Sequence, residues 1–177
     1  MLVAGVPRLV LPGQHRNPPA VEKFAALYTK EGAQSAAPAD PAVLRVVTVS
    51  APKVLDRVRH EIETLQKNGA RPSDIAVLSL AGQMRSHLLE TPTLGSFRLA
   101  RADAADARER VVADTFLRFK GLERPFVIVT ELVRGEVMKY DVRMHIALTR
   151  ATAGVIVVCD EDAVGRDPRL AAIAGKK

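Results

Sequence analysis

The sequence contains five short runs of apolar, often β-branched residues, separated by segments with a different period. Runs of this length and composition are typical of strands. Because they are almost continuously apolar, without polar alternation, they indicate a sheet that is covered on both faces. The predicted strands span residues 43–49, 75–80, 111–115, 126–129 and 155–159.

Between these runs, apolar residues at intervals of three and four predict helices. Asn17 is the predicted N-cap of the first helix because two prolines follow it, and proline is favoured in a first helical turn. Asn68 and Gly69 form a predicted C-terminal cap of the second helix. Helices are expected near residues 18–28, 55–68, 84–89, 137–150 and 169–174.

The alternation of strands and helices predicts an α/β fold with a mainly parallel sheet flanked by helices. A weak β-type run at residues 8–11 precedes the first helix. Residues 31–42, rich in Ala, Pro, Gly and Ser, are a predicted loop. Residues 91–110 are a predicted irregular insertion with a short strand at 97–99. Without internal repeats or a linker, residues 1–177 are interpreted as one domain.

Composition narrows the class of protein. Hydrophobic residues make up 47% and charged residues 26% of the 177 residues, a globular balance. No apolar run approaches the roughly 20 residues that span a bilayer, and no basic region precedes the apolar start, so neither membrane attachment nor a signal peptide is expected. The expected location is cytoplasmic.

Charge and rare residues add two constraints. A formal net charge of +6 is compatible with a polyanionic partner. The absence of Trp and the 4% aromatic content leave little material for a base-stacking surface. Cys159 is the sole cysteine, so the chain forms no internal disulfide and no cysteine-rich zinc site; its place at the end of an apolar run indicates burial. The four histidines lack metal-ligand spacing, and no metal ligands are expected.

Three segments combine polar residues with predicted strand or helix ends. The first is Gln14-His15-Arg16-Asn17. The second, residues 114–123, contains Lys120, Gly121 and Glu123 between two strands. We expect these three residues on a loop at the carboxyl edge of the parallel sheet, where ligands of open α/β sheets bind, and near Arg16 and Arg150 in space. The third, residues 145–151, places Arg150 at a helix end. Taken singly, the second segment is equally compatible with a solvated loop, whereas the first is better explained by a capping turn and the third by an arginine that binds helix-terminal carbonyls.

In this order, the three segments resemble motifs IV, V and VI of UvrD-like superfamily 1 DNA helicases (the UvrD, Rep and PcrA group). Residues 14–17 resemble the Asn-Tyr-Arg string of motif IV. Residues 115–123 resemble motif V, Thr-x-His-x-x-Lys-Gly-Leu-Glu, and residues 147–151, Ala-Leu-Thr-Arg-Ala, match the core of motif VI. Asp-Ile-Ala-Val-Leu at 74–78 also fits, and Arg-Phe-Lys-Gly-Leu-Glu at 118–123 is similar to the branch with nuclease-related-domain proteins.

The resemblance implies the second RecA-like domain (2A) of such a helicase, with the P-loop NTPase superfamily fold. It implies that Arg150, as arginine finger, and Arg16 contact the γ-phosphate of ATP. Glu123, with the loop of Lys120 and Gly121, would contact the nucleotide.

The same resemblance implies that single-stranded DNA, or a DNA junction, meets Thr115, Arg118 and Lys120. Two residues depart from the family pattern: Leu117 replaces a histidine of motif V, and His15 replaces the tyrosine of motif IV.

The chain contains no Gly-x-x-x-x-Gly-Lys-Ser/Thr loop. ATP and Mg²⁺ are therefore expected to be held mainly by a partner, the N-terminal RecA-like domain of the same enzyme, and the isolated chain is expected not to hydrolyse ATP. Two alternatives remain open: a non-catalytic nucleic-acid or protein adaptor derived from a helicase domain, and an unrelated doubly wound domain.

Overall fold

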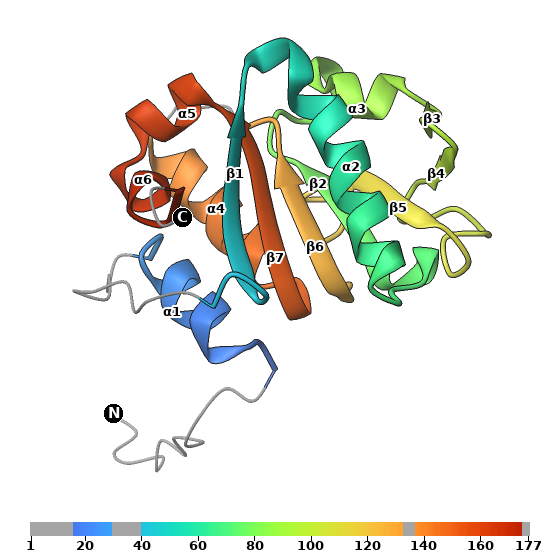
Figure 1. Cartoon of the computed structure of the whole chain (residues 1–177), viewed down its shortest axis with the longest axis horizontal. Helices are drawn as coiled ribbons and strands as arrows, with labels where there is room; N and C mark the ends of the chain where they lie inside the picture. Colours follow the sequence, from blue (N-terminus) through green and yellow to red (C-terminus); the bar gives the residue numbers. More distant parts are fainter. Residues whose placement is uncertain (1–15, 30–39, 133–136, 175–177) are drawn as a thin grey trace, which may run out of the picture.

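The computed structural model describes residues 16–29, 40–132 and 137–174. Its centre is a seven-stranded sheet of order β1-β7-β6-β2-β5-β4-β3, in which only the short β3–β4 pair is antiparallel (Figure 1). The predicted mainly parallel α/β sheet is confirmed. The strands are β1 (Leu44–Val49), β2 (Ile75–Ser79), β3 (Thr93–Leu94), β4 (Phe97–Ala100), β5 (Val111–Thr115), β6 (Arg124–Thr130) and β7 (Ala151–Asp160).

Helices cover both faces of this sheet. In Figure 1, α2 crosses in front of the sheet and α4 lies behind it. The helices are α1 (Pro19–Ala26), α2 (Val54–Lys67), α3 (His87–Glu90), α4 (Val137–Leu148), α5 (Glu161–Arg166) and α6 (Pro168–Ala174), with 3₁₀ turns η1 (Ala51–Lys53), η2 (Pro72–Asp74) and η3 (Gln83–Arg85).

Two hydrophobic cores follow from the period of two along each strand. Leu78 of β2 packs in the core shared with α1, α4 and α6, whereas its neighbour Val77 packs in the core shared with α2 and α3. Every residue of β2 is buried, as the continuous apolar run predicts. Cys159 is also buried, as predicted, and burial raises the pKa of its thiol to about 12.

Most predicted elements are present, with three differences. The 84–89 region is not one helix but η3 followed by the four-residue α3, and the Met84 side chain is 91% exposed. The 91–110 insertion contributes β3 and β4 to the sheet edge. Helix α5 was not predicted, because its six residues carry little apolar periodicity. The predicted run at 8–11 lies outside the described residues.

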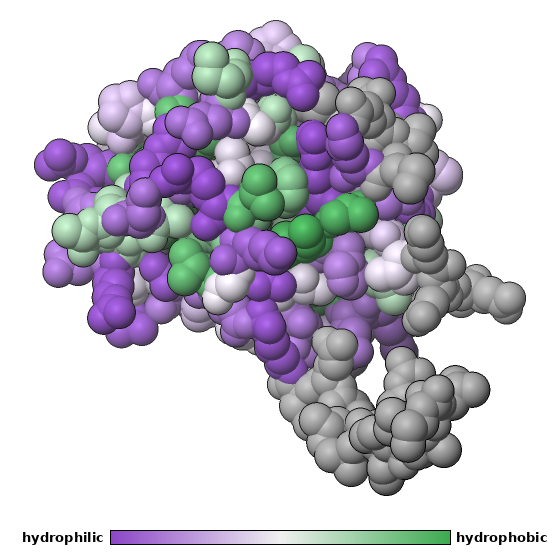
Figure 2. All heavy atoms as spheres, turned by 180° about the vertical axis from the view of Figure 1, so that it is seen from behind, coloured by the Kyte–Doolittle hydropathy of each residue, from purple (hydrophilic) through white to green (hydrophobic). Residues whose placement is uncertain are grey.

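In the described part of the chain, no helix has the length and apolar composition needed to cross a membrane. The face opposite α2, shown in Figure 2, is largely hydrophilic, with small hydrophobic areas between polar side chains.

Candidate functional site

Glu123 and Arg150 lie at the amino edge of the sheet, immediately before β6 and β7. These strands are parallel neighbours, with Arg124 paired to Ala151, and the Arg124 amide donates to the Arg150 carbonyl at 3.1 Å. The expectation that Glu123 lies at the carboxyl edge was therefore wrong. Since β5 and β6 are parallel, the segment that joins them must return from the carboxyl edge to the amino edge.

Arg16 completes a charged cluster with these two residues. It forms an ion pair with Glu123, and both side chains are partly exposed. The pKa of Arg150 is lowered, first by burial and then by the positive charge of Arg16, while Glu123 acts in the opposite direction. The predicted proximity of Arg16, Glu123 and Arg150 is thus confirmed. One carboxylate is thus paired with Arg16 and acts at longer range on Arg150, which leaves an excess of positive charge.

Asn17 fixes the start of this segment against β7. Its side-chain amide donates to the carbonyl of Ala151 at 2.7 Å and to that of Thr149 at 3.1 Å. The predicted N-cap role was wrong: Pro18 is the N-cap of α1, and no side chain caps it. The tertiary bonds satisfy two carbonyls that flank Arg150, whereas a prolyl nitrogen in the first helical turn has no hydrogen to donate to a cap.

Arg150 follows the carboxyl end of α4. Its Nε donates to the Ile146 carbonyl at 3.1 Å, and its Nη2 lies 3.3 Å from the Thr149 hydroxyl oxygen. An arginine at this position binds terminal helix carbonyls favourably. These contacts with the end of α4 orient the Arg150 guanidinium, which lies near the positive charge of Arg16.

The β5–β6 crossover starts at the carboxyl edge with Thr115, which is 5% exposed. The Thr115 hydroxyl accepts from the Arg118 amide at 3.1 Å. Arg118 pairs with Asp103 at 2.5 Å and with Asp114 at 3.3 Å, and the Asp103 hydrogen bond, followed by the charge of Asp114, raises its pKa. The predicted DNA-contacting residues Thr115 and Arg118 thus belong to the end of the crossover away from Glu123.

The middle of the crossover combines one buried anchor with exposed neighbours. Phe119 is 1% exposed and packs in the α1–α4 core, whereas Lys120 and Leu117 are exposed. Gly121 has a φ of 88°, in the left-handed region that favours glycine. Nothing lies within 4 Å of a Cβ built there, so backbone conformation, and not space, calls for glycine.

The carboxyl edge holds a polar cluster that was not predicted from the sequence. Glu131, directly after β6, has a φ of 52°. Its carboxylate accepts from the hydroxyls of Ser79 and Ser86 and from the Leu88 amide at 3.0 Å. The signal in the sequence that could have predicted this cluster is a glutamate directly after a buried strand.

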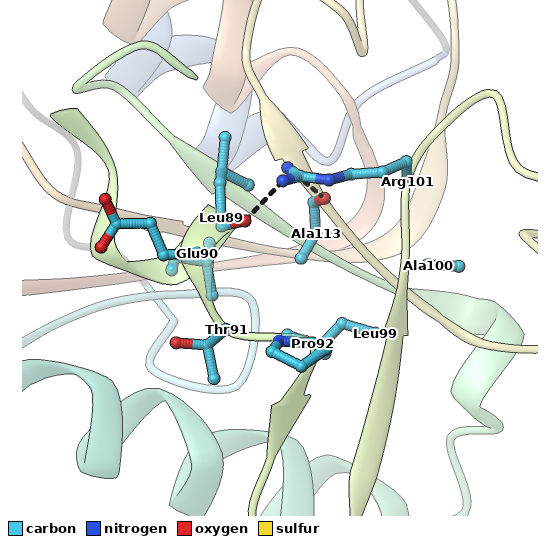
Figure 3. Close-up of a pocket in the computed structure, with 9 residues that line it drawn as sticks. Leu89, Glu90, Thr91, Pro92, Leu99, Ala100, Arg101 and Ala113 are labelled. Atoms are coloured by element: carbon cyan, nitrogen blue, oxygen red, sulfur yellow. Dashed lines mark hydrogen bonds between the residues drawn. The ribbon is translucent and has the colours of Figure 1, made fainter. Parts of the chain in front are cut away.

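A cavity of about 380 Å³ lies on the same side of the molecule, near α3 and the ends of β4 and β5. Figure 3 shows Arg101 across it, with its guanidinium donating to the Leu89 carbonyl at 2.5 Å and lying 3.5 Å from that of Ala113. The residues that carry the predicted chemistry do not line this cavity.

A second unpredicted network anchors α1 to the end of the chain. Asp167, fully buried, accepts from the hydroxyls of Tyr28 and Tyr140, each at 3.0 Å, and from Arg169 at 2.8 Å. Arg169 also pairs with Asp141 and lies over the Tyr28 ring. Burial would raise the pKa of Asp167, but the hydrogen bonds and charge of Arg169 outweigh it and lower that pKa.

Gln14 and His15 lie outside the described residues, so the first half of the predicted motif IV has no structural account. No protein-family model matches the chain, and no curated protein matches it. Among solved structures, the chain is similar to the C-terminal domain of a possible DNA helicase from Lactobacillus plantarum WCFS1, with a TM-score of 0.64 and 14% identity. The match covers 92% of this chain and 96% of the other. At this identity the similarity establishes the fold alone.

Proposed function

We propose that the chain is the C-terminal motor domain of an ATP-dependent DNA helicase or translocase of the UvrD-like type. In this role it completes, from its amino edge, an ATP site whose phosphate-binding loop belongs to an N-terminal RecA-like domain. The observation that carries the proposal is the convergence of Arg16, Glu123 and Arg150, from three distant segments, on adjoining strand ends. The similarity in fold to a helicase C-terminal domain supports it.

The chemistry of the cluster of Arg16, Glu123 and Arg150 suits a nucleoside triphosphate. A guanidinium is planar and permanently charged, and it binds phosphate oxygens through two donors. Arg150, whose charge is destabilised by burial and by Arg16, would gain a compensating anion when a γ-phosphate enters. Glu123 would then accept from a ribose hydroxyl. Mg²⁺ would arrive with ATP and be held mainly by the partner domain.

The crossover gives this site a route to nucleic acid. One short segment runs from Thr115 at the carboxyl edge to Glu123 at the amino edge, anchored midway by Phe119. Nucleotide contacts at Glu123 would therefore be transmitted to Arg118 and Lys120, which are exposed and cationic. Basic side chains of this kind contact the phosphates of single-stranded DNA.

The test combines the purified chain with the RecA-like domain, carrying a phosphate-binding loop, that is encoded nearest to it. The chain alone should show no ATP turnover. Its addition should raise ATP turnover of the partner domain, and single-stranded DNA should raise it further. An adaptor would bind DNA or a protein partner without changing turnover, and that result, or ATP hydrolysis by the chain alone, would overturn the proposal.

A further inference from the structure

We propose that Asn17 is a positioning residue that sets the location of Arg16 relative to Arg150. The kinetic part of this inference rests on the proposed function, whereas its geometric part concerns the chain alone. No role beyond an N-cap was predicted for Asn17, and the structure shows a buried carboxamide, 6% exposed, between two distant segments.

The position that Asn17 occupies is created by a difference in strand length. β7 starts at Ala151, but its neighbour β1 first pairs with it at Val155. Residues 151–154 thus have β6 on one side and, within the described part of the chain, no strand on the other. Thr152 and Ala153 are accordingly exposed.

The carboxamide binds on either side of Arg150, at the turn that leads from α4 into β7. The Arg150 carbonyl points toward β6, where it accepts from the Arg124 amide. The Asn17 carboxamide donates to the carbonyls on either side of it, those of Thr149 and Ala151, beside the part of β7 that does not pair with β1.

This arrangement constrains Arg16 because the two residues share one peptide bond. The Arg16 side chain is 45% exposed, and its ion pair with Glu123 is too exposed to hold the backbone by itself. The buried bonds of Asn17 carry that task. They also hold Thr149 and Ala151, which flank Arg150, so that one carboxamide fixes the backbones of both arginines with respect to each other.

Asparagine is well suited to this position. Aspartate would have the same shape but no N–H to offer, and its charge would face two carbonyl oxygens. Alanine would leave both carbonyls without their donor, and a buried acceptor that loses its partner is unfavourable. Glutamine keeps the two donors but places them one methylene further out, so it should restore part of the effect.

The direct experiment uses the full chain labelled with ¹⁵N. Hydrogen exchange is measured at the Nε–Hε groups of Arg16 and Arg150, assigned with Arg16→Lys and Arg150→Lys. Asn17→Ala and Asn17→Asp should raise the exchange rate at Arg16 roughly tenfold or more, and Asn17→Gln should raise it less. Tyr28→Phe is the matched control, because it removes a buried hydrogen bond near the other end of α1. Arg16 should exchange there at the parental rate.

The kinetic experiment uses the chain combined with its phosphate-binding partner domain. Asn17→Ala should lower kcat for ATP roughly tenfold with little change in KM, since misplacement of a transition-state contact affects kcat. The Arg16→Ala, Asn17→Ala double variant should be no slower than Arg16→Ala. If exchange at Arg16 is unchanged in folded Asn17 variants, or equally raised by Tyr28→Phe, positioning by Asn17 is overturned. If exchange responds but neither arginine affects turnover, positioning stands and the proposed function falls.

Discussion

The two edges of the sheet use polar residues in opposite ways. At the amino edge, the single carboxylate of Glu123 is paired with Arg16 and acts at longer range on Arg150, and the ion-paired side chains are partly exposed. At the carboxyl edge, Glu131 accepts three hydrogen bonds from serine hydroxyls and a backbone amide. Asp114 there also bonds to three neighbours and is fully buried.

Under the proposed function, this difference distinguishes a ligand site from a structural one. Carboxylates that have several internal donors gain nothing from an external partner, whereas two guanidinium groups with one counter-charge still attract an anion. The common rule places ligands of open α/β sheets at the carboxyl edge. In this chain the unbalanced charge lies at the amino edge, which suits a domain that closes over a ligand held by another domain.

The most severe test of this division is Arg150→Ala in the chain combined with its partner domain. Loss of an arginine finger should lower kcat for ATP by roughly 10³-fold, with a much smaller effect on nucleotide affinity. Arg150→Lys should restore little, because an ammonium lacks the bidentate fork. The measurement is single-turnover hydrolysis, with a melting curve for each variant.

Arg71→Ala provides the matched control for Arg150→Ala. Arg71 lies before β2 at the same edge, but it is already paired with Asp74 in its own turn. Removing it should leave the hydrolysis rate near the parental value. An Arg150→Ala protein that hydrolyses ATP at the parental rate would show that Arg150 only binds the carbonyls at the end of α4.

Substitutions at the carboxyl edge should lower the stability of the protein and leave ATP turnover unchanged. Glu131→Ala leaves the hydroxyls of Ser79 and Ser86 and the Leu88 amide without their common acceptor, so the free energy of unfolding should fall by about 2–4 kcal/mol. Glu90→Ala, a change of an exposed neighbour, should alter it by at most about 0.5 kcal/mol. Denaturant titration measures both. Equal effects would mean that the Glu131 cluster is not structural.

The sequence predicted the strands well because burial on both faces demands continuous apolar runs, as in β2. It predicted the convergence of Arg16, Glu123 and Arg150 only through the family resemblance. The edge was predicted wrongly, since the direction in which a crossover returns is a property of three-dimensional topology. The tertiary role of Asn17 was missed for a related reason, because its hydrogen-bond partners lie 132 and 134 residues away in the sequence.

A pH titration tests the scaffold that holds α1, and with it Arg16, in place. The pKa of Asp167 is lowered in the folded state because Arg169 outweighs the effect of burial. A lowered folded pKa means that this contribution is present above the unfolded value of about 3.9 and is lost as the pH falls through the folded value. The stability advantage of the parent over Asp167→Asn should therefore shrink as the pH falls below about 4.

Tyr140→Phe is the control for this titration. It removes one donor to Asp167 but retains the carboxylate and Arg169. Its stability should be lower than that of the parent at every pH, with most of the acid dependence retained. A constant difference between the parent and Asp167→Asn across the acid range would show that ionisation of Asp167 does not contribute.

The smallest expected effect concerns DNA at the carboxyl end of the crossover. Arg118 is 43% exposed and engaged with Asp103 and Asp114. If it also contacts a phosphate, Arg118→Ala should reduce the slope of log K against log salt for single-stranded DNA by about 0.7, as one fewer phosphate is neutralised. The effect on stability should be about 1 kcal/mol or less, because the Asp103 partner is exposed.

Asp103→Asn separates contact with DNA from a purely structural role. It removes the exposed carboxylate that competes for Arg118 but leaves the guanidinium and the buried Asp114 in place. A guanidinium released in this way should bind DNA more tightly at low salt, because the phosphate no longer displaces a carboxylate. Fluorescence anisotropy with a labelled oligonucleotide measures affinity across a range of salt concentrations. If neither variant changes the slope or the affinity, Arg118 only fastens the crossover to the carboxyl edge, and the route from nucleotide to DNA must run through Lys120.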